Sequence, residues 1–113
     1  GTLRQLPRAH TLVSLLIAQG VVREEQSSEH PDRHVLTRAV GSQPTIEPEV
    51  VQVRVPRTAR LLLSSDGLHD VVPPEELARL ASIAELEPAA SALIGRANEL
   101  GGPDNVTAIL VQT

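Results

Sequence analysis

Apolar and polar positions divide the first third of the chain into short segments. Residues 2–6 alternate weakly between polar and apolar side chains, which indicates a short strand. Apolar residues then recur at helical spacing and predict a helix over residues 11–19, with Thr11 as its N-cap. A second short helix is expected over residues 23–29, because Pro31 prevents its continuation.

The middle of the chain predicts a hairpin. Residues 41–44 have the composition of a turn, and valines at alternate positions give residues 45–55 one apolar face. A second apolar run covers residues 59–64, and Pro56 opens the short connection between the two runs. These two runs are expected to pair with each other.

The last third of the chain predicts two helices and a strand. Each helix begins at a proline, and the two are expected over residues 74–81 and 88–100. Gly101 is expected to end the second helix in the left-handed conformation. Residues 106–111 are apolar on both faces apart from one threonine, which predicts a central strand covered on both sides.

Composition narrows the kinds of protein that the chain can be. Its 113 residues suffice for one domain, and they include no Phe, Tyr, Trp, Met or Cys. The core must therefore be built from Leu, Val, Ile and Ala, and disulfides, thiolate zinc sites and cysteine nucleophiles are excluded. A net charge of -4 gives no electrostatic footprint for nucleic acid. No apolar run reaches the roughly 18 residues of a membrane span, so no membrane segment is expected in this chain.

Two short loops carry the most informative chemistry. Asp66 directly follows the apolar run of residues 60–64, and Asp104 directly precedes the run of residues 106–111. If the runs pair antiparallel, the end of the first lies beside the start of the second, and the two carboxylates converge at one rim of a sheet. Carboxylates that converge from separate loops bind hard cations such as Mg²⁺ or Mn²⁺. Taken singly, each loop is also ordinary turn chemistry, with Gly67 permitting a sharp turn.

In their order and flanking residues, these loops resemble the late motifs of the metal-dependent serine/threonine protein phosphatases, the type 2C or PPM family. Residues 61–72 resemble the late metal-binding motif, and residues 101–107 resemble the last motif. Residues 30–41 resemble the segment before the closing strands, and residues 5–13 resemble the middle of the family's domain. The resemblance covers nearly the whole chain in the family's order and is strongest to the bacterial branch.

The resemblance implies an α+β fold that is part of a four-layer αββα sandwich, in which two antiparallel sheets pack face to face with helices outside. Residues 1–113 would be the C-terminal portion of that domain. Two early motifs have no counterpart in the chain: an arginine that grips the substrate phosphate and an aspartate that bridges two metal ions. The chain therefore resembles a fragment, which is expected to be inactive alone and to leave strand edges open.

The implied activity is metal-dependent hydrolysis of phosphoserine and phosphothreonine on proteins, with Mg²⁺ or Mn²⁺ activating a water molecule. By position in the motifs, Asp66 and Asp104 are the implied ligands of the second metal, and Asp66 also of an additional ion found in bacterial relatives. No catalytic residue is assigned within this chain. The implied partners are phosphoprotein substrates and a counterpart serine/threonine kinase, in the cytoplasm. The alternative is a non-catalytic domain of the same fold used for binding or regulation.

Other polar residues near these motifs are expected to serve the structure. Ala9 stands where the family has an acid next to His10, which weakens any supporting role for that loop. The serines lack the context of a nucleophile elbow, so no nucleophilic role is assigned to Ser64, Ser65 or Ser91. Side chains expected to bond locally or to lie at the surface are those of Arg38, His69, Asp70 and Asn105.

Overall fold

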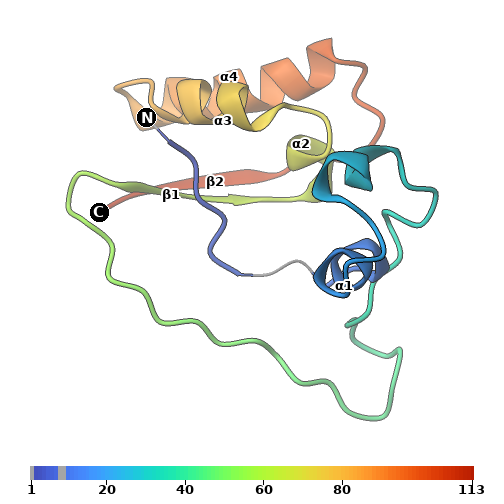
Figure 1. Cartoon of the computed structure of the whole chain (residues 1–113). Helices are drawn as coiled ribbons and strands as arrows, with labels where there is room; N and C mark the ends of the chain where they lie inside the picture. The colour runs from blue at the N-terminus through green and yellow to red at the C-terminus, as the bar shows by residue number, and fades with distance from the viewer. Residues whose placement is uncertain (1, 8–9) are drawn as a thin grey trace. The chain divides into compact units, whose positions relative to one another are not determined.

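The computed structural model describes residues 2–7 and 10–113. It contains two compact units, which are described separately. We call residues Gln5–Gln52 the N-terminal unit, and Val53–Thr113 with the segment ending at Arg4 the C-terminal unit. Figure 1 shows the elements in chain order: α1 (Leu12–Ala18), the 3-10 helix η1 (Glu24–Glu29), β1 (Arg60–Ser64), α2 (Asp66–His69), α3 (Pro74–Ala81), α4 (Leu86–Glu99) and β2 (Ala108–Gln112).

The N-terminal unit is organised around α1. The Thr11 hydroxyl accepts a hydrogen bond from the amide of Ser14 at 3.1 Å, which confirms the predicted N-cap. Thr11 also forms an isolated antiparallel bridge with Leu36, and this bridge joins the start of the helix to the segment that follows η1. Val13 is the buried residue of α1.

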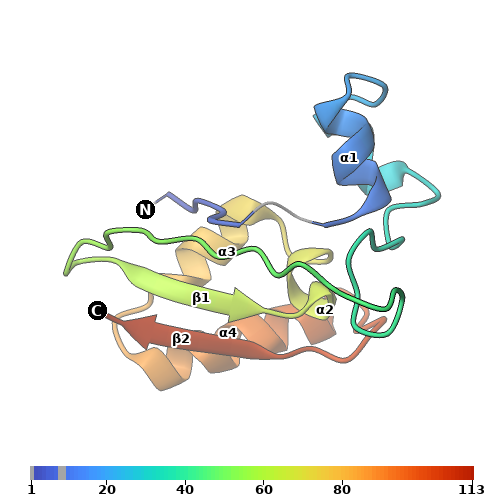
Figure 2. The ribbon, with the colours of Figure 1, turned by 90° about the horizontal axis from the view of Figure 1, so that it is seen from below.

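The C-terminal unit is a two-stranded antiparallel sheet with helices on one face. β1 pairs with β2 in a register that places Leu62 opposite Leu110. Within this unit, α3 and α4 lie together on one face of the sheet, and the opposite face carries neither of them (Figures 1 and 2). Both leucines pack against the buried core under the helices. That core consists of Leu68, Val72, Leu77, Leu80, Leu93 and Ala97.

Local sequence explains where the two long helices begin and end. α3 has a proline in its first turn, followed by Glu75 and Glu76, whose negative charges favour a helix N-terminus. α4 begins two residues before Pro88, because the first amides of a helix have no partner within it and a proline there costs no hydrogen bond. α4 ends in a Schellman motif: Gly101, at φ +113°, donates to the carbonyl of Asn98, and Gly102 donates to that of Ala97.

Arg60 fastens the sheet to the end of α3. Its guanidinium donates to the carbonyl of Ala81 at 2.9 Å and also to the carbonyls of Ile83 and Ala84. Its Nε donates to the side-chain oxygen of Gln112 at 2.7 Å. One side chain at the first position of β1 therefore links both strands to the helix layer.

Two strand predictions were wrong. Residues 2–6 are not a strand, and residues 45–55 form no strand and no hairpin with β1. β1 instead takes β2 as its partner. Pro48 lies near the start of this segment, before its valines, and removes a backbone donor that a ladder would need there.

The last strand differs from its prediction in coverage. β2 begins at Ala108, and only one of its faces is packed under helices. The other face joins that of β1, and we call it the outer sheet face: Leu61, Leu63, Ile109 and Val111, which pair across the strands. Leu63, Ile109 and Val111 are 55%, 54% and 42% exposed. The predicted α+β composition with an antiparallel sheet is confirmed, and no described helix is both long enough and apolar enough to cross a membrane.

Candidate metal centre

The pairing of β1 with β2 brings the two acidic loops to the same end of the sheet. Ser64, the last residue of β1, is opposite Ala108, the first residue of β2. Asp66 follows one strand end by two residues, and Asp104 precedes the other by four. The antiparallel pairing on which the predicted convergence of the two loops depends is therefore present, and both exposed carboxylates lie on the connections at this rim.

Contacts between the two loops continue beyond the strands. The amide of Ser65 donates to the carbonyl of Thr107 at 3.0 Å, and the amide of Thr107 donates to the Ser65 hydroxyl at 2.9 Å. Gly67 approaches the backbone of Asn105 so closely that a Cβ on Gly67 would lie 2.0 Å from the Asn105 carbonyl oxygen. The Asp104 carboxylate accepts a hydrogen bond from the amide of Asn105 at 2.7 Å, which orients it within its own loop.

This donor set fits a hard divalent cation that keeps several water ligands. Carboxylate oxygens are the protein ligands that Mg²⁺ prefers, and such ions are usually held by one or two carboxylates with waters completing the shell. Asp66 and Asp104 supply two carboxylates from separate loops, and their exposure leaves room for waters. The same exposure means that two carboxylates alone would bind such an ion weakly.

Two of the residues around the loops interact as expected. The Ser64 hydroxyl and His69 Nδ1 are hydrogen-bonded at 3.0 Å, and His69 Nε2 lies 3.9 Å from an Asp70 carboxylate oxygen. The His69 side chain is 48% exposed, in agreement with a surface histidine. His69 therefore pairs locally with both Ser64 and Asp70.

Two other expectations concern the N-terminal unit. Arg38 donates to the carbonyl of Glu47 at 3.1 Å, which is the structural hydrogen bond expected of it. His10 Nε2 lies 2.6 Å from a Glu49 carboxylate oxygen, so a glutamate distant in sequence is its acidic partner. Ala9, where an acid was expected, lies outside the described residues.

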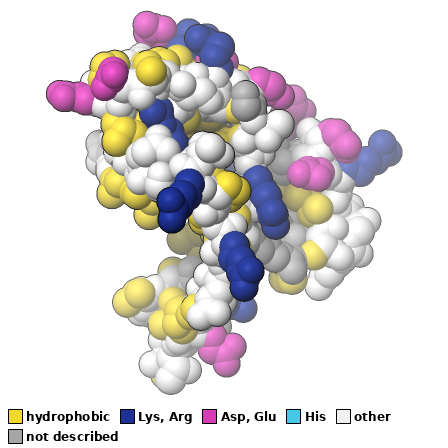
Figure 3. Space-filling view, turned by 90° about the vertical axis from the view of Figure 1, so that its left-hand side faces the viewer, with side chains coloured by type: hydrophobic (Ala, Val, Ile, Leu, Met, Phe, Trp, Pro, Cys, Tyr) yellow, Lys and Arg dark blue, Asp and Glu magenta, His cyan; other side chains and the backbone are white. Residues whose placement is uncertain are grey.

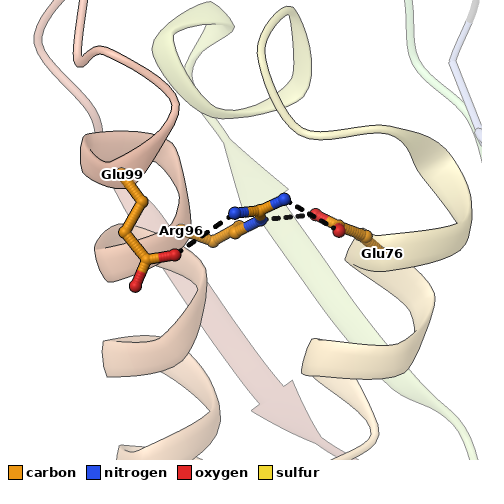
Figure 4. Close-up of polar contacts among 3 residues, drawn as sticks. All are labelled: Glu76, Arg96 and Glu99. Atoms are coloured by element: carbon orange, nitrogen blue, oxygen red, sulfur yellow. Dashed lines mark hydrogen bonds and ion pairs between the residues drawn. The ribbon is translucent and has the colours of Figure 1, made fainter.

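A second polar cluster lies between α3 and α4, away from the acidic loops in sequence. Arg96 forms a forked ion pair with Glu76 at 2.8 and 3.1 Å, and its remaining nitrogen contacts Glu99 at 3.2 Å (Figure 4). The hydrogen bonds from Arg96 lower the pKa of the Glu76 carboxyl, and the same bonds raise the pKa of Arg96. These side chains border a shallow hollow of about 340 Å³. The cluster joins two helices and offers no carboxylate free of an arginine partner.

Charged side chains of both signs are exposed. On the face drawn in Figure 3, arginine, acidic and hydrophobic side chains all reach the surface. The net charge of -4 gives no general attraction for a polyanion. The candidate site of the C-terminal unit is the rim that carries the two acidic loops.

Two side-chain roles in the C-terminal unit, those of Ser65 and Arg60, were not predicted from the sequence. Ser65 was considered only as a nucleophile, whereas its hydroxyl holds the neighbouring loop. The position of Ser65, directly before Asp66 at the end of a predicted strand, could have indicated this role. Arg60 was not singled out, because its bonds reach carbonyls more than 20 positions away.

Comparison with known proteins confirms the resemblance to bacterial PPM-type phosphatases. The chain is 39% identical over 112 residues to the serine/threonine phosphatase Stp of Listeria welshimeri, and the match covers 98% of this chain and 44% of that protein. It is similar in structure to the PPM Ser-Thr phosphatase MsPP from Mycobacterium smegmatis, with a TM-score of 0.87 and 33% identity over 96% of this chain and 47% of that one. No family model matches the chain.

A solved structure that contains bound manganese is also similar to this chain. The structure of the catalytic domain of the serine threonine protein phosphatase PstP, in complex with two manganese ions, matches with a TM-score of 0.83 and 33% identity. That match covers 97% of this chain and 45% of the neighbour. The chain thus spans less than half the length of each of these three proteins, and the expected cofactor, Mg²⁺ or Mn²⁺, agrees with the manganese-bound neighbour.

Proposed function

We propose that residues 1–113 are the C-terminal portion of a PPM-type phosphatase domain that hydrolyses phosphoserine and phosphothreonine on proteins. The observation that carries the proposal is the placement of two acidic loops at one end of the β1–β2 sheet. Similarity over almost the whole chain to bacterial serine/threonine phosphatases supports it.

Within this proposal, Asp66 and Asp104 hold a divalent metal, Mg²⁺ or Mn²⁺. A bound ion of this kind supplies a water molecule of lowered pKa for attack on phosphorus. The chain's own part is to hold two carboxylates on hydrogen-bonded loops at one rim, where the amide of Asn105 orients the Asp104 carboxylate. No residue of the chain is assigned a further catalytic role.

The proposed substrates are phosphoproteins, and the proposed counterpart is a serine/threonine kinase that phosphorylates them. The proposed location is the cytoplasm, where ATP-dependent phosphorylation makes such substrates. These assignments follow from the proposed reaction and from the names of the similar proteins.

The outer sheet face supports the proposal that this chain is one part of a four-layer αββα sandwich. Three of its four apolar residues are between 42% and 55% exposed, although they alternate with partly buried residues that pack against the core under α3 and α4. An apolar face of this kind on a sheet is the surface on which a second sheet packs in a sandwich. We therefore assign this face to contact with a second sheet supplied outside these residues.

The test is a phosphatase assay on the complete natural protein that carries these residues. Hydrolysis of a phosphothreonine peptide at increasing Mn²⁺ should fall at least a hundredfold in Asp66→Asn and in Asp104→Asn. Asp32→Asn, the same change at an exposed turn of the N-terminal unit, should match the unsubstituted protein. Phosphopeptide binding without turnover would favour the non-catalytic alternative, and equal activity of all variants would refute the metal assignment.

A further inference from the structure

Two residues beside the acidic ligands tie the two loops together. Ser65 precedes Asp66 and Gly67 follows it, so both neighbours of one proposed metal ligand contact the loop that carries the other. Their contacts reach Asn105 and Thr107, which lie one and three positions after Asp104. The arrangement goes beyond the two carboxylates, because it fixes one carboxylate-bearing loop to the other.

Gly67 packs against the backbone of the neighbouring loop with no room for a side chain. A Cβ at this position would lie 2.0 Å from the Asn105 carbonyl oxygen, 2.9 Å from its carbonyl carbon and 3.3 Å from the Val106 Cα. All three atoms belong to the backbone, so no side chain can move aside. Gly67 lies in α2 without a positive φ, and its conformation alone does not call for glycine. The absence of a side chain is what allows the two loops to touch.

Gly95 provides the contrast within the same unit. It also lies in a helix, α4, and a Cβ there would meet nothing within 4 Å. Replacing each glycine by alanine is the same chemical change, and only the change at Gly67 forces the loops apart.

At the point where β1 ends, the Ser65 hydroxyl takes the place of a backbone hydrogen-bond acceptor. In a continuing ladder the amide of Thr107 would bond to the carbonyl of Ser65. That carbonyl instead accepts from the amide of Leu68 at 3.0 Å, because the chain turns into α2. The Ser65 hydroxyl takes its place and accepts the Thr107 amide at 2.9 Å. The side chain thus keeps the loops paired while the backbone departs.

We propose that Ser65 and Gly67 are positioning residues that set the separation of the Asp66 and Asp104 carboxylates for a divalent ion. The proposal rests on the proposed function, because it concerns the same metal site. It predicts that metal affinity depends on these two residues even where the fold is unchanged, since their contacts act on the spacing of the ligands.

The experiment measures Mn²⁺ binding to the complete natural protein by water-proton relaxation. The quantity followed is the part of the binding that Asp66→Asn removes. Gly67→Ala should weaken it at least tenfold, and Gly95→Ala should leave it within twofold of the unsubstituted protein. Amide protection of the buried Leu93 is recorded in parallel, as a measure of the fold.

If the Gly67→Ala protein does not fold, variants of Ser65 still test the proposal. Ser65→Ala removes one hydrogen bond and should weaken the Asp66-dependent binding about threefold to tenfold. Ser65→Thr keeps the hydroxyl and should restore the binding to within twofold. Ser82→Ala removes a hydroxyl that bonds within its own helix end, to the carbonyl of Ala78, and should change nothing at the metal.

The outcomes separate this proposal from the proposed function. Mn²⁺ binding that is unaffected by Asp66→Asn and Asp104→Asn would overturn the metal site itself and this proposal with it. Asp66-dependent binding that Ser65→Ala leaves within twofold would overturn the positioning role alone. Weaker binding that merely follows a loss of Leu93 protection would also overturn it, because the effect would then be one of folding.

Discussion

Ile109 offers the sharpest test of the proposed sandwich, because its surroundings should differ between this chain alone and the complete protein. In the structure of the chain its side chain is 54% exposed on the outer sheet face. Full burial of such a side chain contributes about 1.5–3 kcal/mol. With half of the side chain in water, Ile109→Ala should lower the free energy of unfolding of the isolated chain by about 1 kcal/mol.

If a second sheet covers this face in the complete protein, the same substitution leaves a cavity. Replacing a buried Ile by Ala costs about 2–5 kcal/mol, so the loss there should exceed that in the isolated chain by at least 1 kcal/mol. Leu93→Ala is the matched control, since Leu93 of α4 is already 0% exposed in the core of this chain. Its cost, about 2–5 kcal/mol, should be the same in both proteins.

Urea unfolding followed by far-ultraviolet circular dichroism suits this comparison, because the chain has no Trp or Tyr to serve as a fluorescent probe. The isolated chain should bind a hydrophobic dye, and it should be a loosely packed monomer or self-associate through its open strand edges and outer sheet face. The unfolding comparison is therefore made at dilutions where sedimentation shows the isolated chain to be a monomer, because association would cover Ile109. An equal cost of Ile109→Ala in the two proteins would refute the reasoning. A sharply melting strict monomer, with strongly protected amides in β2, would refute it independently.

Four further predictions concern activity, metal, packing and pH. The isolated chain should hydrolyse a phosphothreonine peptide, at excess Mn²⁺, at less than about one-hundredth of a typical enzyme's ~10 per second. Calorimetry on the isolated chain should give a millimolar dissociation constant for Mn²⁺, about -4 kcal/mol, and micromolar binding that survives Asp104→Asn would contradict the assignment of Asp66 and Asp104. Arg60→Lys should lower the free energy of unfolding by about 1–3 kcal/mol, because an ammonium cannot reproduce the fork that binds several carbonyls; an unchanged urea midpoint would contradict this. Because the pKa of Glu76 is lowered in the folded protein, its pairing with Arg96 stabilises the fold above the ordinary carboxyl pKa, and this stabilisation is lost as pH falls through the lowered pKa. Glu76→Gln should therefore reduce the fall in the free energy of unfolding at acid pH.

Elements governed by local signals were predicted well from the sequence. The helix that begins at Pro74 was predicted over residues 74–81 and is α3, because a proline and two glutamates specify its first turn. The end of α4 at Gly101 was also predicted from a local signal, because glycine readily takes the left-handed conformation that ends a helix. The start of α4 was predicted two residues late, because Pro88 was taken as the first helical residue although the whole first turn tolerates proline.

Features that depend on a distant partner were not predicted. A strand needs a neighbour to bond with, and alternating valines in residues 45–55 do not supply one. The outer sheet face was predicted to be covered, since two apolar faces indicate two covering layers, and within these residues only one layer is present. Ser65 and Arg60 act across the sheet, so their roles appear only once the register of β1 and β2 is known.

The candidate site was predicted as far as the convergence of its loops. An antiparallel pairing of the two apolar runs is enough to bring Asp66 and Asp104 to one rim, and the structure has that pairing. The close packing of Gly67 on Asn105 is not encoded in any local pattern, because it follows from how the two loops meet.

The central claim, that Asp66 and Asp104 hold one divalent ion, is tested most directly by anomalous diffraction at the manganese edge. Crystals of the complete natural protein grown with Mn²⁺ should show an anomalous peak about 2.1 Å from a carboxylate oxygen of each of these residues. The same peak should be absent from crystals of Asp104→Asn. Manganese peaks found only elsewhere, with both carboxylates contacting solvent alone, would contradict the account.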